Sequence, residues 1–288
     1  MGVLKAIANG MGTTFRKPRL LVILYVINIV FAAAVAFPFF IIVQTELGHS
    51  FLGSSVRPVD LTWLGEAALK YGDALPALLG GLLVAALLCL ALHVFLNGGV
   101  FGRLLDREGR TTLPTFFGDC GRYFWRFVRL FLVSLVFLLL TFGIGLRLLS
   151  ALLDPLIESA VTEWLPLILS NLHLLAALLL LSIVHMIVDY ARIAVIADEE
   201  AKVLKALRHA LNFLKKRFFR AWAIYLVIVA GTLAGTVVFY AVLGALGGPS
   251  VPLVLMGLVW MQLYIIFRIW VRILFVSAQA EFYRSHPY

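Results

Sequence analysis

Six stretches of the chain are almost continuously apolar, and shorter polar segments separate them. They cover approximately residues 20–43, 76–95, 128–149, 165–188, 221–246 and 251–276. About 20 helical residues cross the hydrocarbon core of a bilayer, so each stretch is long enough to form a transmembrane helix. The pattern therefore predicts an all-α integral membrane protein with six spans, in a single transmembrane domain covering residues 1–288.

A second pattern precedes the first, third and fifth spans, where apolar residues recur every three or four positions and basic residues take the opposite face. The apolar positions before the fifth span are Val203, Leu204, Leu207, Leu211, Leu214 and Phe218. Those before the third are Leu113, Phe116, Phe117, Cys120, Phe124 and Phe127, and those before the first are Val3, Leu4, Ile7, Met11 and Phe15. This spacing favours amphipathic helices lying in the headgroup plane over ordinary cytoplasmic loops.

Comparing the chain with itself shows an internal repeat. The tetrapeptide at residues 3–6, VLKA, recurs at residues 203–206, and an offset of 92 aligns His93 with His185 and Asn97 with Asp189. Three units are expected, at approximately residues 1–99, 100–197 and 198–280, each with an amphipathic helix, a span, an external loop and a returning span. Because an even number of spans separates them, the three hairpins would be parallel repeats.

The basic residues predict how the spans are oriented. Of 24 Lys and Arg residues, only Arg57, Lys70 and Arg147 fall on the side of the loops after spans one, three and five, which leaves 21 on the other side. We call that other side, which holds both termini, the basic side. Positive residues near span ends stay in the cytoplasm. We therefore expect a bacterial inner-membrane protein with a cytoplasmic N-terminus and C-terminus.

Composition and charge support a lipid environment. Hydrophobic residues make up 62% of the 288 residues and charged residues only 14%, whereas soluble domains average about 25% charged residues. The net charge of +9 is spread over separate segments beside the spans. This distribution predicts contact with anionic lipid headgroups and argues against nucleic acid as a partner.

Two cytoplasmic blocks carry a family resemblance. NGGVFGRLLDREGRTTLPTFFGDCGRYFWRFVRL and DYARIAVIADEEAKVLKALRHALNFLKKRFFRAW each combine a basic turn, an amphipathic helix and an aromatic, basic entry into a span. This pattern resembles the membrane domain of membrane-anchored glycerophosphodiester phosphodiesterases and related six-helix bacterial membrane proteins, over approximately residues 76–245. Those enzymes carry catalysis on a separate soluble barrel, for which this chain has no counterpart. The resemblance implies the architecture and no phosphodiesterase activity.

Ionisable residues inside spans are costly and are candidates for function. Five of them form the candidate polar cluster, near the basic ends of spans four and six: His185, Asp189, Arg192, Arg268 and Arg272. The functional hypothesis pairs Asp189 with one of the arginines in a cytoplasm-facing cavity for an anionic headgroup or a proton. The alternative is an ion pair that only locks span four against span six.

A second group of candidates lies in the amphipathic segments, where exposed cations would contact anionic headgroups. They are Arg122, Arg126, Arg129, Lys215, Lys216, Arg217 and Arg220. Determining the topology of the chain is their alternative role.

No P-loop, zinc-protease, serine-hydrolase or Cys/His metal spacing is present in the sequence. We therefore predict a non-enzymatic protein without a cofactor, which binds or moves lipids or another amphiphile, or scaffolds partners. A small-solute transporter or channel, with a path lined by Asn28, His185, Asp189 and Arg268, is the alternative. An intramembrane enzyme and a haem-binding subunit using His93 and His185 are weaker ones.

Overall fold

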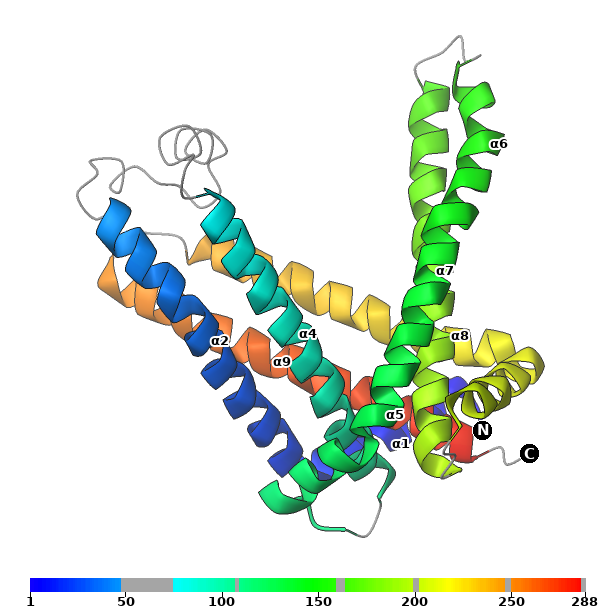
Figure 1. Cartoon of the computed structure of the whole chain (residues 1–288), viewed down its shortest axis with the longest axis horizontal. Coiled ribbons are helices and arrows are strands. Elements are labelled where there is room, and N and C mark those ends of the chain that lie inside the picture. The colour runs from blue at the N-terminus through cyan, green and yellow to red at the C-terminus, as the bar shows by residue number, and fades with distance from the viewer. Residues whose placement is uncertain (48–74, 107–108, 159–163, 199–201, 247–249, 286–288) are drawn as a thin grey trace. The chain divides into compact units, whose positions relative to one another are not determined.

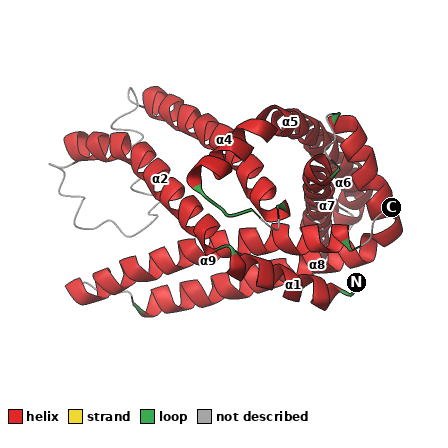
Figure 2. Ribbon diagram, turned by 90° about the horizontal axis from the view of Figure 1, so that it is seen from below, coloured by secondary structure: helices red, strands yellow, loops and turns green. Residues whose placement is uncertain are grey.

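The computed structural model describes residues 1–47, 75–106, 109–158, 164–198, 202–246 and 250–285. Every regular element in these ranges is a helix, as Figure 2 shows, and none of them contains a strand. Six of these helices are long and apolar enough to cross a membrane. The structure thus confirms an all-helical chain with six candidate spans. Arg57 and Lys70, which entered the charge count, lie outside the described residues.

Figure 1 shows the helices coloured in chain order. In chain order the elements are α1 Val3–Arg16, α2 Pro18–Leu47, α4 Leu75–Leu105, α5 Leu113–Leu140, the π-helical turn η2 Thr141–Gly145, α6 Leu146–Glu158, α7 Trp164–Ala197, α8 Val203–Ala245 and α9 Val251–Arg284. The third span is therefore built from α5, η2 and α6. On the basic side, α4, α5, α7, α8 and α9 run well beyond the predicted spans. Apolar composition marks the part of a helix that fits the bilayer, but the helix ends only where its backbone hydrogen bonding is interrupted.

The chain forms two compact units. One comprises residues 1–21 and 94–288, and the other residues 22–93, which hold most of α2 and α4. The sections below concern the first unit, which contains α1, the basic end of α4, and α5 to α9.

The three predicted amphipathic segments differ in how they join their spans. α1 is a separate helix because Lys17 leaves the helical conformation, with φ −119° and ψ 52°, and Pro18 starts α2. α8 continues through its segment with one non-helical residue, Arg217, at φ −140° and ψ 23°. α5 runs without a break from its N-cap, Thr112, into the span.

The core of this unit lies on the basic side, where helices cross closely. A Cβ on Gly10 of α1 would lie 2.8 Å from the backbone of Ala278 in α9, so the two helices touch at that point. A Cβ on Gly99 of α4 would lie 2.6 Å from the Cys120 sulfur of α5. Small residues at such crossings permit helix–helix packing in membrane proteins.

Aromatic rings fill the space between α7, α8 and α9. Phe213 has its ring centroid 5.3 Å from that of Tyr190, 5.7 Å from Phe282 and 4.9 Å from Tyr283. These side chains come from three different helices and are buried. The cluster therefore holds α7, α8 and α9 together.

The amphipathic segments bury only part of the apolar stripe that the sequence predicts. In α8, Val203, Leu207 and Leu214 pack inside the protein, whereas Leu204 is 72% exposed. In α1, Ile7 is buried, whereas Leu4, Met11 and Phe15 are exposed. α1 and α8 therefore each present one face to the protein core and keep bulky apolar side chains on another.

Candidate functional site

The candidate polar cluster contains an ion pair within one helix. In α7 the guanidinium Nη1 of Arg192 lies 2.8 Å from a carboxylate oxygen of Asp189, and the two side chains are mostly buried. Residues three apart face the same side of an α-helix, so the sequence alone brings these two groups together. The pairing offsets part of the cost of placing a carboxylate near the apolar region.

Arg272 of α9 adds a second cation to this cluster. Its Nη2 atom donates a hydrogen bond of 2.6 Å to the amide oxygen of Asn97, near the basic end of α4. Asn97 is buried, and Arg272 lies near enough to Asp189 and Arg192 to interact electrostatically with both. The cluster therefore joins α4, α7 and α9, and it holds two guanidinium groups for one carboxylate.

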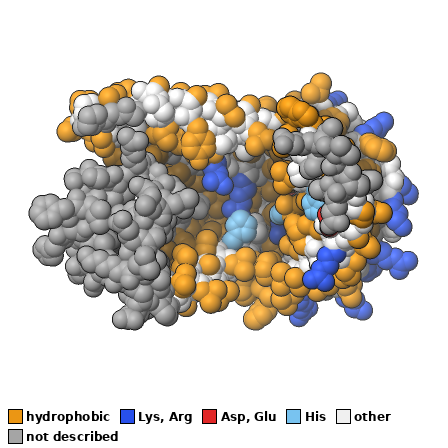
Figure 3. All heavy atoms as spheres, turned by 90° about the horizontal axis from the view of Figure 1, so that it is seen from above, with side chains coloured by type: hydrophobic (Ala, Val, Ile, Leu, Met, Phe, Trp, Pro, Cys, Tyr) orange, Lys and Arg blue, Asp and Glu red, His pale blue; other side chains and the backbone are white. Residues whose placement is uncertain are grey.

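The structure separates the other two predicted members from this pairing. Arg268 and His185 are exposed, and neither forms an ion pair with the described residues. In the hypothesised pairing of Asp189 with one of three arginines, the described partner is thus Arg192, its neighbour one turn away. Figure 3 shows basic and histidine side chains set among hydrophobic ones on one face of the molecule.

Asn97 was not among the predicted site residues, although the sequence holds a signal for it. The offset of 92 aligns Asn97 with Asp189, and both belong to the same cluster. The sequence could suggest that the two positions are equivalent. Only the crossing of α4 with α9 brings Asn97 to Arg272, 175 residues away.

Most of the predicted headgroup contacts are accessible. Arg122, Arg129, Lys215, Lys216 and Arg220 are exposed, and Arg126 and Arg217 are partly exposed. Three of these side chains lie over aromatic rings of their own helix. The guanidinium groups of Arg122 and Arg126 lie 5.4 Å and 5.9 Å from the Tyr123 ring centroid, and that of Arg217 lies 5.2 Å from Phe213. Such contacts hold the cations at the surface of the helix.

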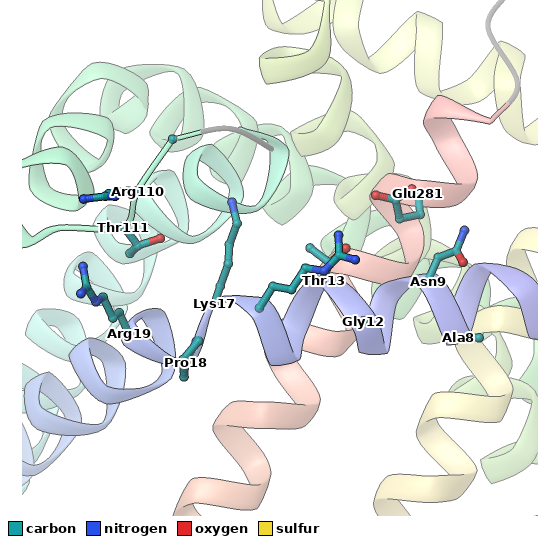
Figure 4. A pocket seen from close by; sticks show the side chains of 12 residues that line it. Ala8, Asn9, Gly12, Thr13, Lys17, Pro18, Arg19, Arg110, Thr111 and Glu281 are labelled. Atoms are coloured by element: carbon teal, nitrogen blue, oxygen red, sulfur yellow. The ribbon is translucent and has the colours of Figure 1, made fainter.

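A basic pocket, which the sequence did not indicate as a site, opens where α1 meets α2. It has a volume of about 870 Å³ and lies between α1, the start of α2, residues 109–111 and Glu281 of α9, as Figure 4 shows. The residues lining it are Ala8, Asn9, Gly12, Thr13, Arg16, Lys17, Pro18, Arg19, Gly109, Arg110, Thr111 and Glu281. Four of these side chains are cationic and one is acidic.

Lys17 fixes the geometry of this pocket. Its ammonium group donates hydrogen bonds to the backbone carbonyls of Arg103 and Asp106, at the end of α4. A lysine is a favourable partner for the unpaired carbonyls that end a helix. Burial lowers the pKa of Lys17 below its ordinary value, with the charges of Arg103 and Arg284 acting in the same direction and Asp106 opposing them.

Hydrogen bonds among polar groups fix the positions of Gly109 and of the start of α5. The backbone N–H of Gly109 donates to the Asp106 carboxylate over 2.9 Å. Thr112 caps α5: its hydroxyl accepts from the N–H of Thr115, and the Thr115 hydroxyl accepts from the N–H of Thr112 over 3.0 Å. These contacts hold Arg110 and Thr111 at the edge of the pocket.

No protein-family model, curated protein or solved structure matches the chain. The resemblance to the membrane domain of membrane-anchored glycerophosphodiester phosphodiesterases therefore stays a prediction.

Proposed function

We propose that this chain is a non-enzymatic, multi-pass membrane protein that binds or moves anionic lipids, or another anionic amphiphile, through its basic side. The observation that carries the proposal is the exposed surface of the amphipathic segments. Leu4 and Leu204 are 78% and 72% exposed, and cations such as Lys5 and Lys205 lie next to them. A surface with apolar side chains beside lysines suits the boundary between acyl chains and anionic headgroups.

Scaffolding of protein partners by the same surface is the other form that this role can take. Lipid is the occupant that we favour, because the same helix exposes bulky apolar side chains, such as Leu204, and cations, such as Lys205. Headgroups and acyl chains supply both kinds of contact at once.

The proposed orientation places the basic side in the cytoplasm of a bacterial cell. It is supported by the 21 Lys and Arg residues assigned to that side. A cysteine at Lys215, in a chain whose Cys89 and Cys120 are replaced by serine and alanine, should react with a membrane-impermeant maleimide only after the cells are opened. Labelling of that cysteine in intact cells would contradict the orientation.

We also propose that three parallel hairpin repeats build the fold. The offset of 200 that aligns the two VLKA tetrapeptides also aligns Lys17 with Arg217, and both leave the helical conformation. The same offset aligns Ala6 with Ala206, which are both fully buried. Equivalent breaks and equivalent buried positions are what a duplicated helix–span unit should retain.

Lipid retention tests the proposed function. The full chain, purified in neutral detergent, is exposed to equal amounts of phosphatidylglycerol and phosphatidylcholine, and the bound lipids are counted by native mass spectrometry. We expect more phosphatidylglycerol to be retained, because cations near the surface attract the anionic lipid.

Single substitutions then show whether the basic side is responsible. Lys216→Gln should weaken retention of phosphatidylglycerol by up to about fivefold, the usual contribution of one cation near an anionic surface. The matched control is Arg147→Gln, which removes an exposed cation of α6 from the opposite side of the chain. Equal retention of the two lipids by the unaltered chain would contradict the proposed function.

A further inference from the structure

We propose that the basic pocket between α1, α2 and residues 109–111 is a built site for the phosphate group of an anionic amphiphile. This inference rests on the proposed function and names the site and the chemical group. Arg16, Arg19 and Arg110 line the pocket, and within the described ranges none of the three guanidinium groups has a carboxylate partner. Guanidinium groups match the oxygens of a phosphate in geometry and charge.

An unpartnered hydroxyl inside the pocket gives independent support for a ligand. Thr111 is only 6% exposed, and its Oγ1 atom is buried without a hydrogen-bond partner among the described residues. Figure 4 shows this oxygen turned toward the side of the pocket where Lys17 stands. A buried hydroxyl that lacks a partner costs free energy, and a phosphate oxygen is an acceptor that would satisfy it.

Formal charge also favours an anion. The pocket is lined by four cationic side chains, those of Arg16, Lys17, Arg19 and Arg110, and by one carboxylate, that of Glu281. The Glu281 side chain has an interaction of its own. Lys17 uses two of its three N–H donors for the carbonyls at the end of α4. Lys17 is therefore a positioning residue, whereas the three arginines are the ligands that we assign.

The three faces of α1 identify the ligand as an amphiphile. With about 100° per residue in an α-helix, Ala6, Gly10 and Thr14 share the face that packs on the core, and Leu4, Met11 and Phe15 share an exposed apolar face. The residues that line the pocket, from Ala8 to Arg16, form the remaining face. A phosphate in the pocket therefore lies next to an apolar strip along which an acyl chain can pack.

The depth of the pocket agrees with this reading. Pro18, one of its lining residues, is also the first residue of the first candidate span. The pocket therefore lies where a span meets the headgroup region, which is the level of a lipid phosphate.

Direct binding to the full chain tests the site. The protein in neutral detergent is titrated with short-chain phosphatidylglycerol, with short-chain phosphatidylcholine and with inorganic phosphate. We expect one saturable phosphatidylglycerol site, weakened at least about tenfold in the double variant R19Q/R110Q, since hydrogen bonds to charged groups contribute that much or more. Thr111→Val should weaken it to a similar extent, and Thr111→Ser should restore it because the hydroxyl returns.

The control is Arg147→Gln, which removes a cation from an exposed position of α6 outside the pocket. It should leave the saturable site intact. Binding of inorganic phosphate with the same affinity and the same dependence on Arg19 and Arg110 would assign the pocket to a free phosphate instead of a lipid headgroup.

Two further outcomes separate this inference from the proposed function. If both R19Q/R110Q and Thr111→Val bind phosphatidylglycerol as well as the unaltered chain does, the pocket is not its binding site. The proposed function would still stand if the chain prefers phosphatidylglycerol to phosphatidylcholine. Conversely, if the chain lacks that preference but binds inorganic phosphate in a way that depends on Arg19 and Arg110, the proposed function is removed and the pocket is retained only as a site for free phosphate.

Discussion

The two ends of α9 are made of similar residues but have different surroundings. Toward the basic side Ile273 and Phe282 are fully buried, whereas Val254, Leu255 and Leu258 near the other end are each more than half exposed. The same holds for α7, where Tyr190 and Ile193 are buried and Leu174 and Leu178 are exposed. Hydrophobicity therefore shows that a segment belongs in lipid, but it does not show which half packs against protein.

The difference lies in the neighbouring helices. Lipid tails are as apolar as leucine, so burial of apolar surface gives no advantage to helix contact within the bilayer. Close packing then depends on small residues, aromatic rings and polar groups that need partners. Gly10, Gly99, Phe213 and Arg272 supply these contacts at the basic ends. Four predictions test this comparison.

The largest effect is expected in the aromatic cluster. Phe213→Ala should lower the free energy of unfolding by about 3–5 kcal/mol, because it leaves a cavity between α7, α8 and α9. Phe219, six residues further along α8, is 79% exposed, and Phe219→Ala should change stability by no more than about 0.5 kcal/mol. Thermal unfolding in one detergent measures both. Similar losses for the two variants would refute a core confined to the basic side.

The crossing of α1 and α9 offers a matched pair of glycines. Gly10→Ala should destabilise the protein by about 1–3 kcal/mol, because its Cβ would collide with the backbone of Ala278, which cannot move independently of its helix. The Cβ that Gly12→Ala adds has no atom within 4 Å, so this substitution should stabilise α1 by up to about 1 kcal/mol. If both substitutions change the free energy of unfolding in the same direction, the backbones of α1 and α9 do not touch at Gly10.

The polar cluster should respond to the loss of one buried cation. Arg272→Met removes the donor to Asn97 and should cost about 1–3 kcal/mol, since the buried amide oxygen loses its described partner. Arg268→Met, at an exposed position one turn earlier, should have an effect within about 0.5 kcal/mol. Chemical unfolding of the two variants provides the measurement. A larger effect at Arg268 would show that Arg268, and not Arg272, is the arginine that stabilises the cluster.

The smallest effect is a dependence on pH at Lys17. Because burial holds the pKa of Lys17 below 10.5, the unfolded chain binds one more proton than the folded chain between that lowered pKa and 10.5. The contribution of Lys17 to stability therefore rises with pH through this window, as the buried charge is lost. Unfolding from pH 8 to 10.5 should show this rise in the unaltered chain and not in Lys17→Met. Parallel pH profiles would contradict it.

The sequence predicted the helical class and the apolar segments because both depend on local composition. Each predicted span falls on helices that the structure describes, to within a residue at the end of α8. It also offered Arg192 as one of three arginine partners for Asp189, and the structure pairs these two side chains, which lie three residues apart on one helix. Orientation, repeat and headgroup contacts stay predictions, which the experiments above address.

The basic pocket and the contact between Arg272 and Asn97 could not be predicted in this way. Arg19, Arg110 and Glu281 are far apart in sequence, and the pocket exists only because α1 packs on α9 and Lys17 binds the end of α4. The sequence holds one signal for the pocket, the basic run Arg16-Lys17-Pro18-Arg19 at the start of the first span. A count of charges uses this run only as evidence for the orientation of the span.

The amino-acid sequence by itself determined that this chain is helical, apolar enough for six membrane crossings, and basic on one set of span ends. These properties follow from residues close together in the chain. Only the tertiary structure decided which faces of the amphipathic segments are buried and which cations converge around the unpartnered hydroxyl of Thr111. Those outcomes depend on how helices cross, and crossing depends on shape complementarity between distant segments, which no local pattern encodes.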